Sequence, residues 1–301
     1  MLDKKRAVDP GAISIRVVEP YDFSLSLRVM RSFQPPAAMQ GKSLRLATTV
    51  AGTAASIEVV ESTAKASSLV AASVPGTDSG QVREIVEWVI FGDLDLTPFY
   101  RLTAENPRLA IVTKRLHGVK PMRPVSLFEM AVIAITEQLI SLAAAYRIRS
   151  RVIEKFGKPV EDQWIFPEPQ VLARATIEDL RSCGLSQQKA GYIRDLAVKI
   201  AEGPLDIDVL KTMDDDAARE MIMGWRGFGR WSADYILVRG LARPDCVPID
   251  DLAVRSVVGE YLGNGQRISA TEVTDMLEPF RPYRGLLAFY LLADHRSVPR
   301  P

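Results

Sequence analysis

The stretch MIMGWRGFGRWSADYILVRGLARPDCVPIDDLAVRSVVG, residues Met221–Gly259, carries the strongest indication of fold and chemistry in the chain. It begins with the end of one helix, passes through Arg226–Gly229 and opens a second helix at Arg230 or Trp231. Two glycines around one apolar residue predict a tight hairpin in which Phe228 points inward and the backbone stays uncovered. Bare N–H groups at a helix N-terminus form an anion site that a DNA phosphate would fit. An ordinary turn between two helices explains the hairpin, taken alone, about equally well.

The composition sets broad limits on the rest of the chain. The 301 residues, 47% of them hydrophobic, can bury a substantial core and suffice for two domains or three small ones. The formal net charge is only +1, so a DNA-binding face would need local clusters of Lys and Arg. Cys183 and Cys246 stand far apart without neighbours at metal-ligand spacing, which argues against a disulfide scaffold and a zinc site. Because no apolar stretch suits a signal peptide or a membrane span, we expect a cytoplasmic protein with no membrane partner.

Two regions of different secondary structure are expected, so the predicted fold class is α+β. Four short runs with strand-like alternation and one helical stripe predict an antiparallel sheet domain with helices over residues 1–116. The strands are expected at residues 13–18, 44–50, 57–60 and 69–74, and the helix at 82–90. A linker at 117–126, rich in proline and polar residues, begins the second domain, 117–301, which we expect to be all-α. Its clearest predicted helices lie at 128–145, 187–202 and 231–242.

Several ordered motifs resemble the helix-hairpin-helix superfamily of DNA glycosylases, and most closely its bacterial 3-methyladenine DNA glycosylase II branch. The matching segments are 20–24, 128–141, 180–190, 227–235, 239–245, 247–252 and 279–284. The resemblance implies an enzyme of base excision repair that flips a damaged base out of double-stranded DNA and hydrolyses its N-glycosidic bond, leaving an abasic site. Alkylated bases such as 3-methyladenine and 7-methylguanine are the implied substrates. A nucleoid-associated monomer is the implied state.

The superfamily places its essential aspartate at the start of the helix after the hairpin helix, where Asp250 and Asp251 stand side by side. The family pattern, an apolar residue three positions later and then a basic one, fits Asp251 with Val254 and Arg255. For an isolated aspartate at this place, helix capping is the commoner role. We therefore expect Asp251 to be catalytic and Asp250 to cap or support the helix, with an exchange of the two roles as the alternative.

The residue after Arg230 separates two mechanisms within the superfamily. Members that also cut the strand have a lysine there, which attacks C1′ and forms a Schiff base. This chain has Trp231, which predicts a glycosylase without lyase activity. An indole at this place can stack on an electron-poor alkylated base, although core packing is an equally good explanation for a single aromatic residue.

The resemblance also implies the remaining site residues. Tyr235 and Tyr283 would complete the base pocket, and Glu137 stands near its mouth, where close relatives often have glycine. Leu139, in the loop between the first helices of the helical domain, would fill the gap left by the flipped base. The backbone-binding set comprises Gly227, Phe228, Gly229 and Arg230.

No metal and no cofactor are expected, because the two cysteines cannot hold an iron–sulfur cluster. In relatives bound to DNA the hairpin carbonyls hold a Na⁺ or K⁺ ion, and the sequence leaves such an ion open here. The basic cluster of Arg147, Arg149, Arg151, Lys155 and Lys158 is interpreted as a solvated helix face rather than a phosphate site. Excision of a deaminated or oxidised purine, and damaged-DNA binding without catalysis, remain as alternative functions.

Overall fold

The N-terminal part of the chain forms an antiparallel five-stranded sheet. The computed structural model describes residues 12–33, 39–40, 42–62, 68–73 and 76–297. The sheet order is β1 (Ile13–Arg16), β5 (Ser68–Ser73), β4 (Thr53–Glu61), β3 (Ser43–Val50) and β2 (Met39–Gln40). Along β3 every second residue is buried, which is the period expected of a sheet with one face on a core. The four predicted strands are therefore confirmed, but β1 ends at Arg16 rather than at residue 18, and residue 74 lies outside the described residues.

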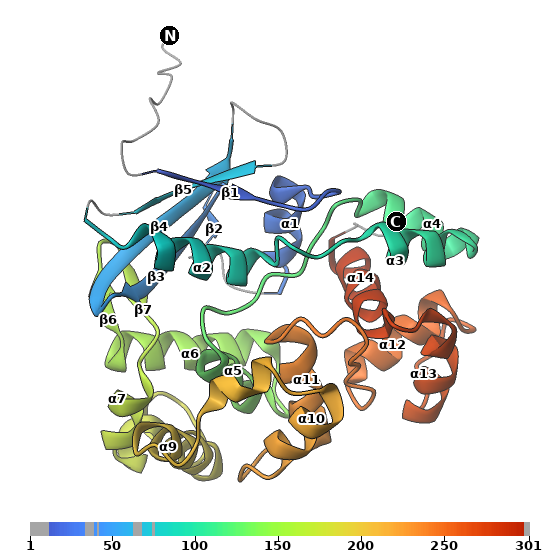
Figure 1. Ribbon diagram of the computed structural model, residues 1–301. Coiled ribbons are helices and arrows are strands. Elements are labelled where there is room, and N and C mark those ends of the chain that lie inside the picture. Colours follow the sequence, from blue (N-terminus) through green and yellow to red (C-terminus); the bar gives the residue numbers. More distant parts are fainter. Residues whose placement is uncertain (1–11, 34–38, 41, 63–67, 74–75, 298–301) are drawn as a thin grey trace.

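Four helices accompany this sheet. They are α1 (Phe23–Met30), α2 (Ser79–Ile90), α3 (Thr97–Ala104) and α4 (Pro107–Arg115). Figure 1 shows α2 running beside the sheet, while α3 and α4 lie farther out, next to the C-terminal helices. The α2 helix begins where the Asp78 side chain accepts hydrogen bonds from two backbone N–H groups, a regular N-cap.

The remainder of the described chain is mainly helical, so the predicted fold class is confirmed. The helices are α5 (Leu127–Glu137), α6 (Leu142–Phe156), α7 (Pro169–Arg174), α8 (Ile177–Ser182), α9 (Gln187–Ala201), α10 (Asp215–Met223), α11 (Arg230–Arg239), α12 (Leu252–Tyr261), α13 (Ala270–Leu277) and α14 (Arg284–Ser297). Short 3₁₀ helices lie at Ile207–Lys211 and Glu278–Phe280. A small hairpin, β6 (Lys158–Val160) and β7 (Gln163–Ile165), interrupts the helices; its Asp162 and Glu161 form ion pairs with Arg45 of β3.

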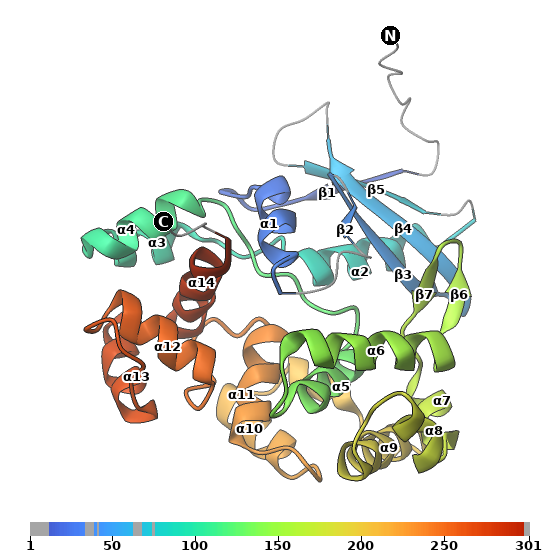
Figure 2. The ribbon, with the colours of Figure 1, turned by 180° about the vertical axis from the view of Figure 1, so that it is seen from behind.

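The hydrophobic side chains form two cores whose limits differ from the predicted domains. One core is shared by the sheet, helices α1–α4 and helices α12–α14. The other is formed by the helices from α5 through α11. Figures 1 and 2 show the same grouping, with the C-terminal helices beside α3 and α4. The C-terminal helices α12–α14 thus pack with the N-terminal sheet rather than with α5–α11. This packing does not test where one domain ends and the next begins, so the boundary between residues 116 and 117 stays a prediction.

The segment predicted as a linker, 117–126, is packed between these parts. Lys120 in it is fully buried, and its Nζ donates hydrogen bonds to the carbonyls of Val18 and Gly92, at 2.8 and 3.0 Å. The indole of Trp88 donates to the carbonyl of Pro124 at 2.9 Å. The connection is thus held by hydrogen bonds to the sheet domain.

The prediction of one continuous helix at 128–145 is wrong, because α5 ends at Glu137 and α6 begins at Leu142. Leu139, between them, has a φ of 57°, in the left-handed region that a continuing helix cannot contain. The side chain of Ser141 then accepts a hydrogen bond from Ala144 N and caps α6. Since most residues of α5 and of the first turn of α6 are apolar, hydrophobic pattern alone does not reveal the break.

Candidate active site

The predicted hairpin between α10 and α11 is present, and its two glycines differ in backbone conformation and in their surroundings. Gly227 has a φ of 90°, and a Cβ built on it would lie 2.2 Å from the ring of Tyr192. Gly229 has an ordinary φ of −98° and faces open space, with no atom within 4 Å of a built Cβ. Phe228 between them is buried and packs edge-on against Trp225. The hairpin therefore folds around Phe228 and leaves the backbone at Gly229 uncovered.

Gly229 is also the N-cap of α11, and within the described part of the chain no side chain caps this helix start. Such a helix start attracts anions. Arg230, the first residue of the helix, is 57% exposed and lies 3.2 Å from the buried carboxylate of Asp234. The same carboxylate accepts a hydrogen bond from Arg219 at 2.7 Å, so Arg230 is held beside the N-terminus with much of its guanidinium in solvent.

Leu139 lies near the hairpin and projects fully into solvent, with a relative exposure of 104%. The adjacent Gln138 connects the two loops, because its Nε2 donates to Gly227 O at 3.0 Å and to Ser232 Oγ at 2.9 Å. Lys189 at the start of α9 donates from its Nζ to the carbonyl of Gln138 at 2.6 Å. An exposed leucine in a tethered, left-handed loop is unusual for a core residue and suits the wedge role that the sequence predicts.

Asp251 is the N-cap of α12 and contacts the hairpin helix. Its Oδ1 accepts hydrogen bonds from Ala253 N at 2.8 Å and Val254 N at 3.2 Å. Its Oδ2 accepts one from the indole Nε1 of Trp231 at 2.9 Å. The capping role expected for Asp250 is therefore wrong: α12 begins at Leu252, so Asp251 is the residue that precedes it, and Asp250 is exposed. A supporting role for Asp250 stays a prediction.

A chain of contacts runs from Asp251 into the protein. Trp231 stacks on Tyr235, with ring centroids 5.0 Å apart and planes at 17°. The Tyr235 hydroxyl donates to Glu137 Oε2 at 2.7 Å, and Arg149 donates to Glu137 Oε1 at 2.6 Å. Burial, and then the adjacent Glu137 carboxylate, raise the pKa of the Tyr235 phenol, so it remains a hydrogen-bond donor. The structure thus brings Asp251, Trp231, Tyr235 and Glu137 together.

Tyr283 does not join this chain of contacts. Its ring packs against Phe99 of α3, with centroids 6.0 Å apart, on the core shared by the sheet domain and the C-terminal helices. No hydrogen bond or ring contact among the described residues connects it to Asp251, Trp231 or Tyr235. A pocket role for Tyr283 therefore has no support in these contacts and stays a prediction.

Arg149 is a site residue that the sequence interpretation missed. It was assigned to a solvated basic face, and this is wrong, since the residue is 6% exposed and paired with the buried Glu137. The signal was its spacing: Ala145, Arg149 and Val152 are the three buried residues of α6 and form one helical stripe. Gln138 and Lys189 were also missed, because their bonds to backbone carbonyls leave no trace in the pattern.

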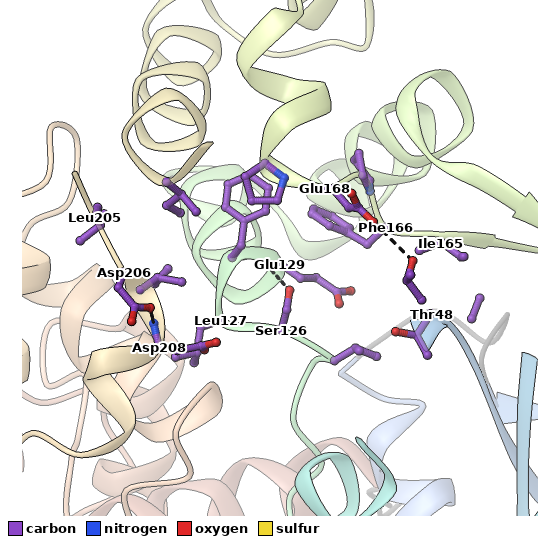
Figure 3. Close-up of a pocket in the computed structure, with 18 of the residues that line it drawn as sticks. Thr48, Ser126, Leu127, Glu129, Ile165, Phe166, Glu168, Leu205, Asp206 and Asp208 are labelled. Atoms are coloured by element: carbon purple, nitrogen blue, oxygen red, sulfur yellow. Dashed lines mark hydrogen bonds between the residues drawn. The ribbon is translucent and has the colours of Figure 1, made fainter. Parts of the chain in front are cut away.

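Two sizeable cavities flank the sheet. One, of about 360 Å³, is lined by Glu137, Tyr235 and Arg149 among others and therefore adjoins the contact chain. The other, of about 520 Å³, lies between β3, the start of α5 and the Ile207–Lys211 turn. Figure 3 shows carboxylates such as Glu129 and Asp206 on its wall. None of the predicted site residues lines this second cavity.

The described residues contain no group of three or more His, Cys, Asp or Glu side chains placed to hold a metal ion. Cys183 and Cys246 are separate and buried. Within the same part of the chain no helix is long and apolar enough to cross a membrane.

The sequence was compared with models of known protein families. Residues 132–282, half of the chain, match the model described as "HhH-GPD superfamily base excision DNA repair protein". The chain belongs to the HhH-GPD superfamily. The matched segment includes the hairpin, the loop at Leu139 and Asp251, so the contact chain described above is formed by the superfamily's own segment.

Individual relatives within the HhH-GPD superfamily agree with this assignment. The chain is 30% identical over 214 residues to the DNA-3-methyladenine glycosylase of Bacillus subtilis, covering 70% of each protein. It is 33% identical over 158 residues to the DNA-3-methyladenine glycosylase 2 of Escherichia coli, covering 52% of each. Its fold is similar to the 3-methyladenine DNA-glycosylase from Archaeoglobus fulgidus, with a TM-score of 0.82 at 24% identity over 95% of this chain and 98% of that one.

Proposed function

We propose that this protein is a monofunctional DNA glycosylase that hydrolyses the N-glycosidic bond of alkylated bases in double-stranded DNA. The observation that carries the proposal is the Asp251 carboxylate, fixed at the N-terminus of α12 and by the indole of Trp231. The names of the relatives from Bacillus subtilis and Escherichia coli support the choice of alkylated bases.

The role of Asp251 follows from the chemistry of the bond. Cleavage of an N-glycosidic bond develops positive charge on the deoxyribose, as in other glycoside hydrolyses. A carboxylate beside C1′ stabilises that charge and can orient or deprotonate the attacking water. The N–H groups of Ala253 and Val254 at the start of α12 and the indole N–H of Trp231 all donate hydrogen bonds to the Asp251 carboxylate. They also hold the carboxylate in one orientation, so little reorganisation is needed during the reaction.

The other residues of the site bind and expose the damaged nucleotide. The uncovered helix start at Gly229 and the guanidinium of Arg230 receive phosphates of one strand. Leu139 enters the stack as the base leaves it, and a flipped base can stack on the paired rings of Trp231 and Tyr235.

The absence of lyase activity is part of the proposal. At the position after Arg230, Trp231 has no amine that could form a Schiff base with C1′. Water is then the nucleophile, and the product is an abasic site in an intact strand. The partner we propose is double-stranded DNA with a damaged base, bound by a monomer.

A panel of duplexes, each with one lesion, tests this function. After incubation, alkali should break the strand at 3-methyladenine or 7-methylguanine, whereas the same samples without alkali should remain intact. Borohydride added during the reaction should trap no covalent complex. Gel retardation without alkali-sensitive breaks would identify a non-catalytic binder instead, and breaks without alkali would identify a lyase.

A further inference from the structure

One side chain joins the loop that carries Leu139 to the hairpin before α11. The amide Nε2 of Gln138 donates hydrogen bonds to Gly227 O at 3.0 Å and to Ser232 Oγ at 2.9 Å. Gly227 belongs to the hairpin, and Ser232 lies buried in the first turn of α11. Gln138 directly precedes Leu139, so the residue that crosses to the hairpin is next to the one that projects into solvent.

The start of α9 holds the same loop from another side. The Nζ of Lys189 donates hydrogen bonds to the carbonyls of Thr136 and Gln138, at 3.0 and 2.6 Å. The last carbonyls of a helix have no partner within that helix, and a lysine ammonium is a favourable partner for them. The carbonyl of Gln138 is thus held by Lys189 and its side chain by the hairpin, which fixes the backbone that leads into Leu139.

Further along, α9 also contacts the hairpin. The Tyr192 ring fills the space beside Gly227, where a built Cβ would lie 2.2 Å from the ring. The guanidinium of Arg226 lies 5.5 Å from the centroid of the same ring and forms an ion pair with Asp195 at 2.6 Å. An exposed ion pair contributes little by itself, whereas the packed ring prevents the hairpin from shifting toward α9. One helix therefore contacts both the Leu139 loop and the hairpin.

We propose, resting on the function proposed above, that Gln138 and Lys189 are positioning residues that hold the Leu139 loop at a fixed place relative to the hairpin. Binding of a phosphate at Gly229 then brings Leu139 to the duplex in a preformed position. A loop that had to become ordered during base flipping would lose conformational entropy at that step, and a preformed loop does not. Both residues act through Leu139, so their removal slows flipping and leaves phosphate binding at the hairpin intact.

The flipping rate of Gln138→Met tests this inference, because methionine keeps the length of the side chain and removes both donors. Stopped-flow fluorescence of a duplex with 2-aminopurine beside one 7-methylguanine measures the rate. It should fall roughly 3- to 10-fold, the scale of one net hydrogen bond. Affinity for an undamaged duplex, which reports phosphate contacts, should stay within about threefold in anisotropy. Lys189→Met should slow flipping similarly, and Lys189→Arg, which keeps charge and donors, should recover most of the rate.

A Leu139→Gly background separates positioning from a general effect on stability. Since Gln138 acts through Leu139, Gln138→Met/Leu139→Gly should flip the base within about twofold of the rate of Leu139→Gly alone, whereas independent effects would multiply. Gln163→Met is the matched control, because the Nε2 of Gln163 also donates to a backbone carbonyl, that of Arg45 at 3.3 Å, but between β7 and β3. It should flip the base at the wild-type rate.

Three results would overturn this inference alone. They are a wild-type flipping rate in Gln138→Met, multiplied losses in the double variant, and an affinity for the undamaged duplex that falls as much as the flipping rate. If Gln138→Met does not fold, Lys189→Met provides the same comparison in the same Leu139→Gly background. A wild-type chain that flips no base overturns the proposed function as well.

Discussion

Alanine at Gly227 is expected to lower the stability of the fold, whereas alanine at Gly229 is expected to lower DNA affinity and leave stability nearly unchanged. At Gly227 the φ of 90° costs a residue with a Cβ about 1–2 kcal/mol. The new methyl group would also lie 2.2 Å from the Tyr192 ring, an overpacking that costs about 1–3 kcal/mol. Together these terms predict that Gly227→Ala lowers the free energy of unfolding by about 2–5 kcal/mol.

At Gly229 neither term applies, since φ is −98° and a Cβ meets no atom within 4 Å. Alanine is a weaker N-cap than glycine, which lowers the free energy of unfolding, but it also makes the unfolded chain less flexible, which raises it. Because these two effects oppose each other, Gly229→Ala should change the free energy of unfolding by less than about 1 kcal/mol. The methyl group does stand where a phosphate would approach the backbone. Loss of one hydrogen bond to a charged group predicts DNA affinity lower by about tenfold or more.

Urea unfolding and fluorescence anisotropy of a duplex with an abasic-site analogue separate the two effects. The double variant Tyr192→Ala/Gly227→Ala should recover the overpacking part and leave the backbone part, as a double-mutant cycle would show. Equal unfolding midpoints for Gly227→Ala and the wild type would refute the structural reasoning. Wild-type affinity in Gly229→Ala would refute the assignment of the hairpin to DNA.

Three further outcomes are expected. Leu139→Gly should leave the free energy of unfolding unchanged or raise it by up to about 1 kcal/mol, because φ at residue 139 is 57° and the side chain is exposed. The same variant should slow excision roughly 10-fold, because no side chain fills the gap left by the flipped base. Stopped-flow 2-aminopurine fluorescence measures the flipping step, and flipping at the wild-type rate would contradict the wedge role. Burial raises the pKa of Glu129 to about 7, so the folded chain retains a proton that the unfolded chain loses near pH 4.5. Stability should therefore fall between about pH 4.5 and 7, by on the order of 2 kcal/mol, and Glu129→Gln should remove that slope in urea titrations. Arg149→Met leaves the buried Glu137 carboxylate without its charged partner and should lower the free energy of unfolding by about 3–5 kcal/mol. The double variant Glu137→Gln/Arg149→Met should lose less stability, and equal losses for the single and double variants in calorimetry would contradict the pairing.

The sequence was most informative where local chemistry determines local structure. The glycines at 227 and 229 predict the hairpin, and alternation predicts the strands, because both signals reflect constraints within a few residues. It was least informative where a residue's role depends on distant parts of the chain. Arg149 was interpreted as solvated because its partner, Glu137, lies on another helix.

At the candidate site, too, local sequence signals were only partly sufficient. Asp251 was expected to be catalytic and Asp250 to cap or support the helix, whereas the structure gives the cap to Asp251 and also connects it to Trp231. One carboxylate can therefore cap a helix and accept a hydrogen bond from a neighbouring indole at the same time. The association of α12–α14 with the sheet domain depends on side chains far apart in the chain, so no local pattern predicts it.

The most direct test of the account is the single-turnover excision rate of Asp251→Asn beside Asp250→Asn on one lesion duplex, with binding measured in parallel. Asparagine caps a helix about as well as aspartate, so Asp251→Asn should fold and bind DNA while losing the negative charge at C1′. We expect Asp251→Asn to slow excision by at least about 100-fold, the usual scale for a fixed electrostatic contact, and Asp250→Asn to excise within about tenfold of the wild type. Near-wild-type excision by Asp251→Asn, or a larger loss in Asp250→Asn, would contradict the assignment of Asp251 as the catalytic carboxylate.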